Sequence, residues 1–243
     1  MNVSRNELSA ALKKAFEALG FEPGDYYDAA DMVVWLQTHG FYGLDRLQAA
    51  LSFFNSNVPT HAELVREDES TFVLNGKGTS ILLCGSEAVN LVTSRAIEGG
   101  TVSLDVVNCF NRSFVIQRLL KATRRNVAFI AYWRQHSHAV KVSVSPSADL
   151  PIYQLFTKAS HLNEQSLRIL AGPSIDRIEE DYSWELSLGD SHEEFSSADM
   201  RRCYQESIEH GIEIDQDLWC ALDSLATQVL VESNDGSRSG AGD

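Results

Sequence analysis

The sequence predicts a mixed α/β protein in which an N-terminal helical unit packs on a domain with a mixed sheet. Apolar residues follow helical spacing over roughly the first 55 residues, and shorter strand-like runs then take over. A strand, a helix and a second strand succeed one another between residues 102 and 133. We therefore expect a helical unit over residues 1–57, a mixed α/β domain with C-terminal helices over 58–232, and a flexible tail over 233–243.

The helical unit is predicted to contain three helices. Ser4 and Glu7 have the spacing of a capping box, and Gly20 suits the end of the first helix. A second helix is expected over residues 25–38 and a third over 44–53.

The α/β domain is predicted to begin with short strands. Strands are expected over residues 63–65, 70–74 and 80–83. The run Asn75-Gly76-Lys77-Gly78 is typical of a turn, and Ser86 is the expected cap of a helix that ends at Gly99-Gly100.

The later elements complete the domain. A buried strand over residues 102–107 precedes a helix over 113–125 and a strand over 127–133. Further strands are predicted over residues 140–144, 153–156, 167–170 and 184–188, and helices over 196–211 and 218–230. The pattern does not define how the strands after residue 135 pair.

Charge and hydropathy exclude several partners. The formal net charge of −14 argues against nucleic acid, which is bound by clustered Lys and Arg. No run approaches the ~20 apolar residues of a membrane helix, so we expect no membrane partner. The N-terminus lacks the apolar core of a signal peptide, and a cytoplasmic location is the expectation.

The cysteines and histidines predict no metal site. Cys84, Cys109, Cys203 and Cys220 are widely spaced, which favours free thiols over disulfides or zinc ligands. His136 and His138 would share one face of a strand, but two ligands do not make a metal site.

The joint between the second and third helices is the first candidate site. His39, Tyr42 and Arg46 lie within eight positions, and Gly40 and Gly43 permit backbone turns there. Arg46 could present a planar fork to a carboxylate, while His39 and Tyr42 could supply polar contacts or move a proton. A plain turn, with Arg46 on the surface and Tyr42 packed, is the structural alternative.

The segment between the strand at 102–107 and the following helix is the second candidate. Such a position is a usual one for ligand-binding groups in α/β sheets. Asn108, Asn111 and Arg112 could contact a substrate, although Asn111 or Ser113 could equally cap the helix. Cys109 could be a buried filler or, near a helix N-terminus, a reactive thiol.

These residues resemble a known family, the type II malate/L-lactate dehydrogenases. In that family an alanine-rich helix leads to a loop that ends Ser-His-Gly-x-x-Arg, and here residues 28–34 lead to residues 41–46. The resemblance places Tyr42 at the family's proton-transferring histidine and Arg46 at its carboxylate-binding arginine.

The resemblance continues over roughly the first 135 residues. A family segment similar to Asn-Ser-x-His-Phe-Gly corresponds to residues 108–113, with Asn108 matched and Asn111 at the position of the histidine. The chain also looks similar to a group of short, uncharacterised bacterial proteins that end Ser-Arg-x-Gly-Ala-Gly, here residues 237–242. The resemblance implies a type II malate/lactate dehydrogenase-like fold, a homodimer with its site near the subunit interface and, by resemblance only, an NAD(P) cofactor.

The expected function is binding of a small carboxylate metabolite similar to a 2-oxo or 2-hydroxy acid, with a divergent oxidoreductase as the first enzyme class. The expected catalytic residues are Tyr42, His39 and Cys109, and the expected substrate-binding residues are Arg46, Asn108, Asn111 and Arg112. Two alternatives stay open: a cofactor-independent isomerase, racemase or lyase that uses Cys109, and a non-catalytic subunit of a heteromeric enzyme that binds a partner chain.

Overall fold

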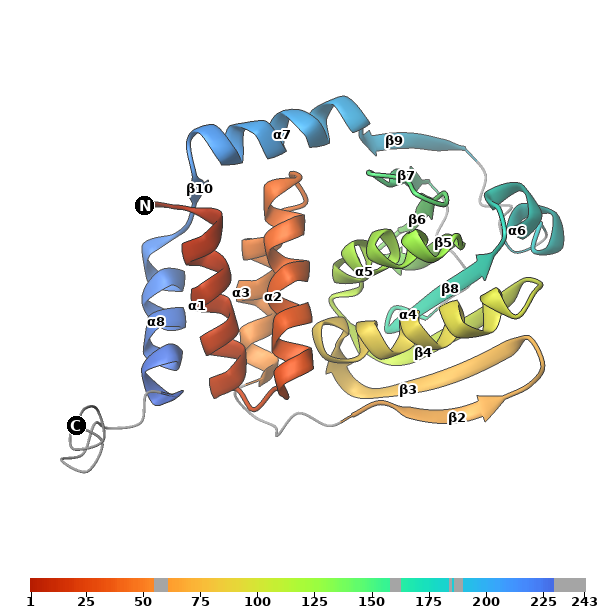
Figure 1. The fold of residues 1–243 in the computed structure, drawn as a ribbon, viewed down its shortest axis with the longest axis horizontal. Coiled ribbons are helices and arrows are strands. Elements are labelled where there is room, and N and C mark those ends of the chain that lie inside the picture. The colour runs from red at the N-terminus through yellow and green to blue at the C-terminus, as the bar shows by residue number, and fades with distance from the viewer. Residues whose placement is uncertain (55–60, 158–162, 184, 186–189, 230–243) are drawn as a thin grey trace, which may run out of the picture.

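The computed structural model describes residues 1–54, 61–157, 163–183, 185 and 190–229. Figure 1 shows a group of helices on one side and an α/β domain on the other. The strand expected over residues 184–188 falls almost entirely outside the described residues, and the tail expected over 233–243 lies outside them altogether.

The three helices predicted near the N-terminus are present. After strand β1 (Asn2–Val3), they are α1 (Arg5–Ala18), α2 (Pro23–Thr38) and α3 (Gly43–Phe54). The capping box of α1 is formed: the Glu7 amide donates to Ser4 Oγ at 3.2 Å, and the Ser4 amide donates to Glu7 Oε2 at 2.7 Å.

The α/β domain is built on a mixed sheet that has eight strands among the described residues. In chain order these are β2 (Glu63–Glu67), β3 (Thr71–Ser80), β4 (Val102–Phe110), β5 (Ala128–Gln135), β6 (His138–Val144), β7 (Ile152–Phe156), β8 (Ser166–Gly172) and β9 (Ser191–Phe195). Their spatial order is β2-β3-β4-β8-β5-β6-β7-β9, with only β3 and β4 parallel as neighbours. Because β8 runs antiparallel to both β4 and β5, the strands β3, β4 and β5 share a direction and end at one edge. We call this the carboxyl edge.

Two predictions around β3 are wrong. Residues 75–78 form no hairpin turn but an irregularity inside β3, where Lys77 and Gly78 have φ of 52° and 76°. No separate strand covers residues 80–83, because β3 ends at Ser80 and α4 (Ile81–Ile97) begins directly after it. Ser80 caps this helix, and its Oγ accepts from the Leu82 amide at 3.2 Å. Ser86, the expected cap, lies inside the helix.

The glycine in α4 explains part of this error. Gly85 suggests a break in a helix, yet a Cβ there would lie 2.8 Å from Cγ2 of Ile81 and 3.8 Å from Cε of Met32. A side chain at this position would therefore crowd Ile81, one turn earlier in α4, while Met32 of α2 lies at an ordinary contact distance.

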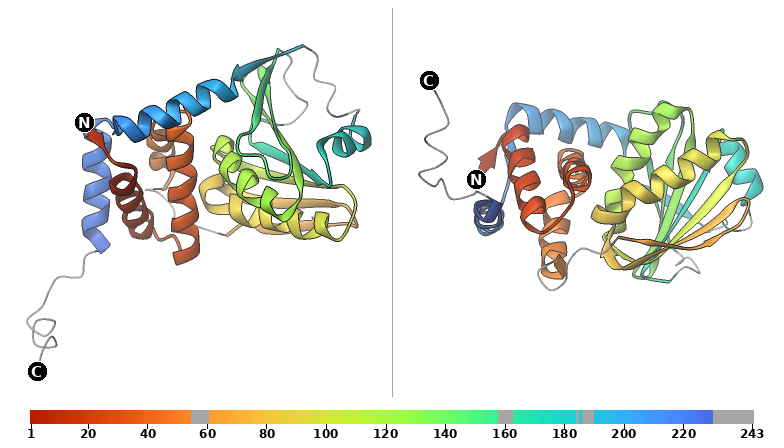
Figure 2. Two further views of the ribbon diagram at one scale, coloured as in Figure 1. Left: turned by 45° about the horizontal axis from the view of Figure 1, so that its top comes forward. Right: turned by 60° about the horizontal axis from the view of Figure 1, so that its bottom comes forward.

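Helices cover the sheet on both faces (Figure 2). One face carries α4 and the helical run η1 (Arg112–Phe114), α5 (Val115–Ala122) and η2 (Thr123–Arg125), and the other carries α6 (Ile175–Asp181). Alternation along β5 serves both layers: Phe129, Ala131 and Trp133 join the main core, while Ala128, Ile130 and Tyr132 pack with α6.

The face toward α6 also holds a network of ionisable groups. Arg168 Nη1 donates to Asp105 Oδ2 at 2.6 Å, and Arg168 Nη2 donates to Glu185 Oε1 at 2.7 Å. The Tyr132 hydroxyl donates to Glu185 Oε2 at 2.5 Å. Burial is the main cause that raises the pKa of Tyr132, so its hydroxyl stays protonated.

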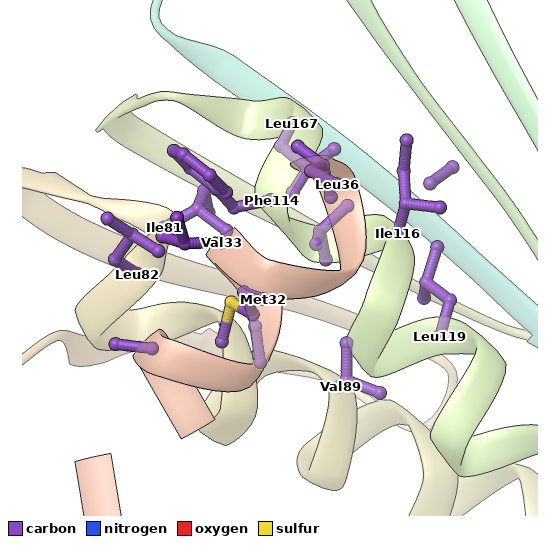
Figure 3. Close-up of a cluster of buried hydrophobic side chains, with 14 of the residues drawn as sticks. Met32, Val33, Leu36, Ile81, Leu82, Val89, Phe114, Ile116, Leu119 and Leu167 are labelled. Atoms are coloured by element: carbon purple, nitrogen blue, oxygen red, sulfur yellow. The ribbon is translucent and has the colours of Figure 1, made fainter. Parts of the chain in front are cut away.

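Buried apolar side chains hold α2 against the α/β domain. In Figure 3, side chains of α2 lie among those of α4, η1–α5 and β8. The labelled residues are Met32, Val33 and Leu36 of α2; Ile81, Leu82 and Val89 of α4; Phe114, Ile116 and Leu119 of η1–α5; and Leu167 of β8. Truncating one such residue, as in Leu36→Ala, is expected to cost about 2–5 kcal/mol. The joint after α2 is thus fixed against the carboxyl edge.

The C-terminal segment returns to the N-terminal helices. Helix α7 (Ser197–Glu209) leads to β10 (Ile212–Glu213), which pairs antiparallel with β1, and α8 (Gln216–Val229) packs along α1 (Figure 1).

The boundary at residue 57 between the helical unit and the α/β domain stays a prediction. Within the described part of the chain, no helix combines the length and hydropathy needed to cross a bilayer.

Candidate functional site

The joint between α2 and α3 is a strained turn. Gly40 has φ of 83°, and Tyr42, which is 60% exposed, has φ of 53°. The left-handed conformation costs a bulky residue about 1–2 kcal/mol. A Cβ on Gly43 would lie 2.5 Å from the Val33 carbonyl oxygen, so the turn needs glycine there. The sequence correctly placed a glycine-dependent turn at this point.

Arg46 connects the two candidate segments. Its Nε donates to the Phe41 carbonyl oxygen at 2.8 Å, and its Nη1 donates to Oγ of buried Ser113 at 2.8 Å. The guanidinium makes no ion pair with any residue that the structure describes. Both of its partners are uncharged, so the positive charge of this half-buried group is uncompensated and Nη2 is left to donate elsewhere.

The end of β4 and the residue that follows it present two amide side chains in left-handed conformations. Asn108 (φ 54°) is exposed, and its Nδ2 donates to Asn75 Oδ1 at 3.1 Å. Asn111 (φ 56°) stands before η1 without capping it through its side chain, and its Oδ1 is buried with no hydrogen-bond partner among the described residues.

Backbone strain gathers at the predicted site. Seven non-glycine residues in the described part of the chain have positive φ, and three of them are Tyr42, Asn108 and Asn111. Such conformations cost about 1–3 kcal/mol each and cluster at functional sites. Three of the seven thus lie at the carboxyl edge, among the residues that the sequence singled out.

Arg112 ties three elements of the carboxyl edge together. Its Nη1 donates to the Glu164 carbonyl oxygen, and its Nη2 donates to the Arg134 carbonyl oxygen at 3.1 Å. Its Nε is buried without a partner among the described residues, and burial lowers its pKa. The backbone therefore occupies both terminal nitrogens that a substrate would use.

His39 lies toward α7. Its ring stacks on Trp35 with centroids 4.2 Å apart and on Tyr204 at 5.1 Å, and its Nδ1 lies 2.8 Å from the Trp35 carbonyl oxygen. Burial lowers the pKa of the imidazole. Its hydrogen bonds and ring contacts include neither Arg46 nor residues 108–113, so the structure does not bring His39 together with them.

Cys109 is a buried thiol. It has no exposed surface, its Sγ lies 3.4 Å from the Val106 carbonyl oxygen, and burial raises its pKa well above the usual range. Cys84 is also buried, which raises its pKa to about 12. Both thiols are neutral at physiological pH, whereas nucleophilic chemistry requires the thiolate.

Sequence reasoning missed two partners of the site. Ser113 was considered only as a helix cap, but it accepts from Arg46, and a hydroxyl two positions after Asn111 was the available signal. Asn75 was assigned to a turn, but it contacts Asn108 because β3 and β4 are parallel neighbours. The described residues contain no group of three His, Cys, Asp or Glu arranged to hold a metal ion.

A family model covers part of the chain. It is described as a protein of unknown function (DUF3726) and matches residues 3–76. No curated protein matches the sequence.

Solved structures match almost the whole chain. Malate dehydrogenase from Entamoeba histolytica superposes with a TM-score of 0.68 at 11% identity, covering 96% of this chain and 99% of that one. Malate dehydrogenase from Pyrococcus horikoshii gives a TM-score of 0.69 at 13% identity, covering 96% of both chains. The chain has the malate/lactate dehydrogenase-like fold.

The fold likeness extends further than the sequence resemblance. Delta1-piperideine-2-carboxylate reductase from Pseudomonas syringae also matches, with a TM-score of 0.60, 11% identity, and coverage of 93% of this chain and 99% of that one. The sequence resemblance was expected over about the first 135 residues only. The dehydrogenase-like fold continues through the strands and helices that follow.

Proposed function

We propose that this protein binds a small 2-oxo or 2-hydroxy carboxylate at the carboxyl edge, between the joint and residues 108–113, with Arg46 as the anchor. The observation that carries this proposal is the guanidinium of Arg46, which two uncharged oxygens hold at 2.8 Å each. A carboxylate would supply the missing negative charge, and charge-assisted hydrogen bonds of this kind are the strong ones.

The neighbouring groups suit the remainder of such a ligand. The Oδ1 of Asn111 has no partner among the described residues but is covered by the protein, so it would accept a hydrogen bond from a 2-hydroxyl group after the side chain turns toward the ligand. The hydroxyl of the exposed residue Tyr42 can donate a hydrogen bond to a 2-oxo oxygen. Leaving a buried carbonyl oxygen without a donor costs about 1–3 kcal/mol, which a ligand hydroxyl would recover.

The names of the fold neighbours support the ligand class. Two of them are malate dehydrogenases and one is a reductase of a 2-carboxylate. Sequence identities of 11–13% support only a shared fold, so the proposed ligand class depends on the contacts of Arg46 and Asn111.

Hydride transfer with a nicotinamide does not fit the residues of this site. Such a reaction needs a proton donor beside the reacting carbon, a task that suits the pKa of histidine. Tyr42 and Asn111 occupy the two positions where the resemblance places histidines, and the imidazole of His39 stacks on Trp35 and Tyr204 instead. The side-chain amide of Asn111 does not gain or lose a proton near neutral pH. The proposal is therefore binding, with no step through NAD(P).

The test is the thermal midpoint of the full-length protein against a panel of ligands. The panel contains 2-oxo acids, 2-hydroxy acids, the matched primary alcohols without a carboxylate, and NADH and NADPH. We expect saturable increases with the acids only.

Other results of this test would contradict the proposal or favour one of the alternatives. A shift with NADH or NADPH would overturn the exclusion of nicotinamide and make Tyr42 the donor to test. Absence of a shift with every acid would end the carboxylate proposal and direct the search to a partner chain. Labelling of Cys109 by iodoacetamide at neutral pH would favour the isomerase alternative.

A further inference from the structure

A cavity separate from the site at Arg46 lies on the side of α2 that faces α5. Its volume is about 340 Å³, and it opens where α2, the α5–η2 run and the loop between β6 and β7 meet. Its lining includes Trp35, Leu120, Lys121, Arg124, Ser147 and Asp149. Ligand sites prefer concave junctions between structural units, and their volumes begin near 300 Å³.

The cavity carries charges of both signs. Arg124 makes no ion pair with any described residue, and neither does Asp149. Both line the same cavity without forming a salt bridge to each other, so more than 4.0 Å separates their charged atoms. Lys121 adds a second cation, which lies 3.4 Å from Asp31 Oδ2 and 3.8 Å from Asp28 Oδ1.

This combination selects against singly charged ligands. Lys121 is already paired with Asp28 and Asp31, so Arg124 is the cation of this lining that has no carboxylate partner among the described residues and can attract an anionic group. Asp149 would repel a simple anion, and Arg124 would repel a simple cation. A ligand with both charges a few ångströms apart would bridge Arg124 and Asp149 and satisfy each.

The remaining lining combines apolar residues with the polar residues Gln117, Thr123 and Ser147. The half-buried ring of Trp35 and the buried side chain of Leu120 offer an apolar surface. Ser147, in the loop beside Asp149, has φ of 58°, a strained conformation for a residue with a side chain.

We propose that this cavity is a binding site for a free α-amino acid, separate from the site at Arg46. The carboxylate would lie on Arg124, the ammonium group on Asp149, and the side chain on Trp35 and Leu120. The lining offers a cation, an anion and apolar side chains. An α-amino acid matches these three features, because it joins a carboxylate, an ammonium group and a side chain at one carbon.

The test is isothermal titration calorimetry of the full-length protein with L-alanine, L-leucine and L-phenylalanine. L-Leucinol and 4-methylpentanoate, which each lack one of the two charges of leucine, serve as matched ligands. We expect saturable binding of an amino acid and at least tenfold weaker binding of both analogues.

Variants locate the site. Arg124→Ala and Asp149→Asn are each expected to weaken amino-acid binding at least tenfold. Arg125→Ala, at an exposed neighbour outside this cavity, and Arg46→Ala, at the proposed carboxylate site, should stay within twofold of the unsubstituted protein. No saturable binding of the three amino acids, or equal losses in Arg124→Ala and Arg125→Ala, would overturn the proposal. Loss in Arg46→Ala alone would place the amino acid at the other site.

Discussion

Two arginines on different sides of this molecule differ in the charge of their partners. Arg168, on the sheet face toward α6, donates to the carboxylates of Asp105 and Glu185 at 2.6 and 2.7 Å. Arg46, at the carboxyl edge, donates to a carbonyl oxygen and a hydroxyl at 2.8 Å each. The first guanidinium is neutralised within the fold, while the second keeps a net positive charge at a strained edge. The partners of an arginine thus separate a structural role from a ligand-binding one.

The largest effect is expected on the face toward α6. Arg168→Met would leave the carboxylates of Asp105 and Glu185 without their cationic partner, and the side chain of Glu185 is only 6% exposed. Because an uncompensated buried charge is costly, we expect a loss of about 3–5 kcal/mol in the free energy of unfolding. Urea denaturation measures it. Arg177→Met, at an exposed arginine paired with Glu180, is the control and should change stability by less than about 1 kcal/mol.

The corresponding change at the edge should be milder. Arg46→Met removes two hydrogen bonds to uncharged oxygens and leaves no carboxylate exposed to repulsion. We expect a loss of about 1–2 kcal/mol in the same denaturation experiment. If Arg46→Met lowered the free energy of unfolding as much as Arg168→Met, Arg46 would have a structural role equal to that of Arg168. The distinction between the two arginines would then be wrong.

The strain at the edge predicts a stabilising substitution. Tyr42 is exposed with φ of 53°, a conformation that glycine adopts without steric penalty. Tyr42→Gly should therefore raise the free energy of unfolding by about 1 kcal/mol, whereas Tyr42→Phe, which keeps the strain, should leave it unchanged. Thermal unfolding of the three proteins measures both. Destabilisation by Tyr42→Gly would mean that the ring, not the backbone, dominates this position.

The smallest effect is a pH dependence from His39. Burial lowers the pKa of its imidazole in the folded protein below the ordinary value of 6.5, so the unfolded chain binds the proton more readily. Stability should therefore fall as pH drops below about 6.5 and level off above pH 7. His39→Gln should reduce this slope between pH 7 and pH 5.5, measured by urea midpoints. An unchanged slope would assign the dependence to other groups.

The sequence predicted local elements well where short-range signals decide them. The capping box of Ser4 and Glu7, the turn at Gly40 and Gly43, and the start of the helical run near Ser113 all depend on neighbouring residues. The boundary at Ser80 was missed because the apolar run Ile81-Leu82-Leu83 suits a strand as well as the first turn of a helix, and Gly85 does not break α4.

The site was predictable as two segments but not as one geometry. Arg46 and residues 108–113 were chosen separately, and only the fold shows that Ser113 joins them. The direction of the His39 ring and the backbone contacts of Arg112 depend on α7 and on residues near β8, which lie far away in the sequence. No local pattern could define those contacts.

The most direct test of the central claim is calorimetric titration of L-lactate and L-malate into the unsubstituted protein, Arg46→Met and Arg124→Ala. We expect saturable binding of both acids. Arg46→Met should weaken their affinity at least tenfold, and Arg124→Ala should leave it within twofold of the unsubstituted protein. Equal affinity in Arg46→Met and the unsubstituted protein would contradict the central claim, because an anchor cannot be removed without loss.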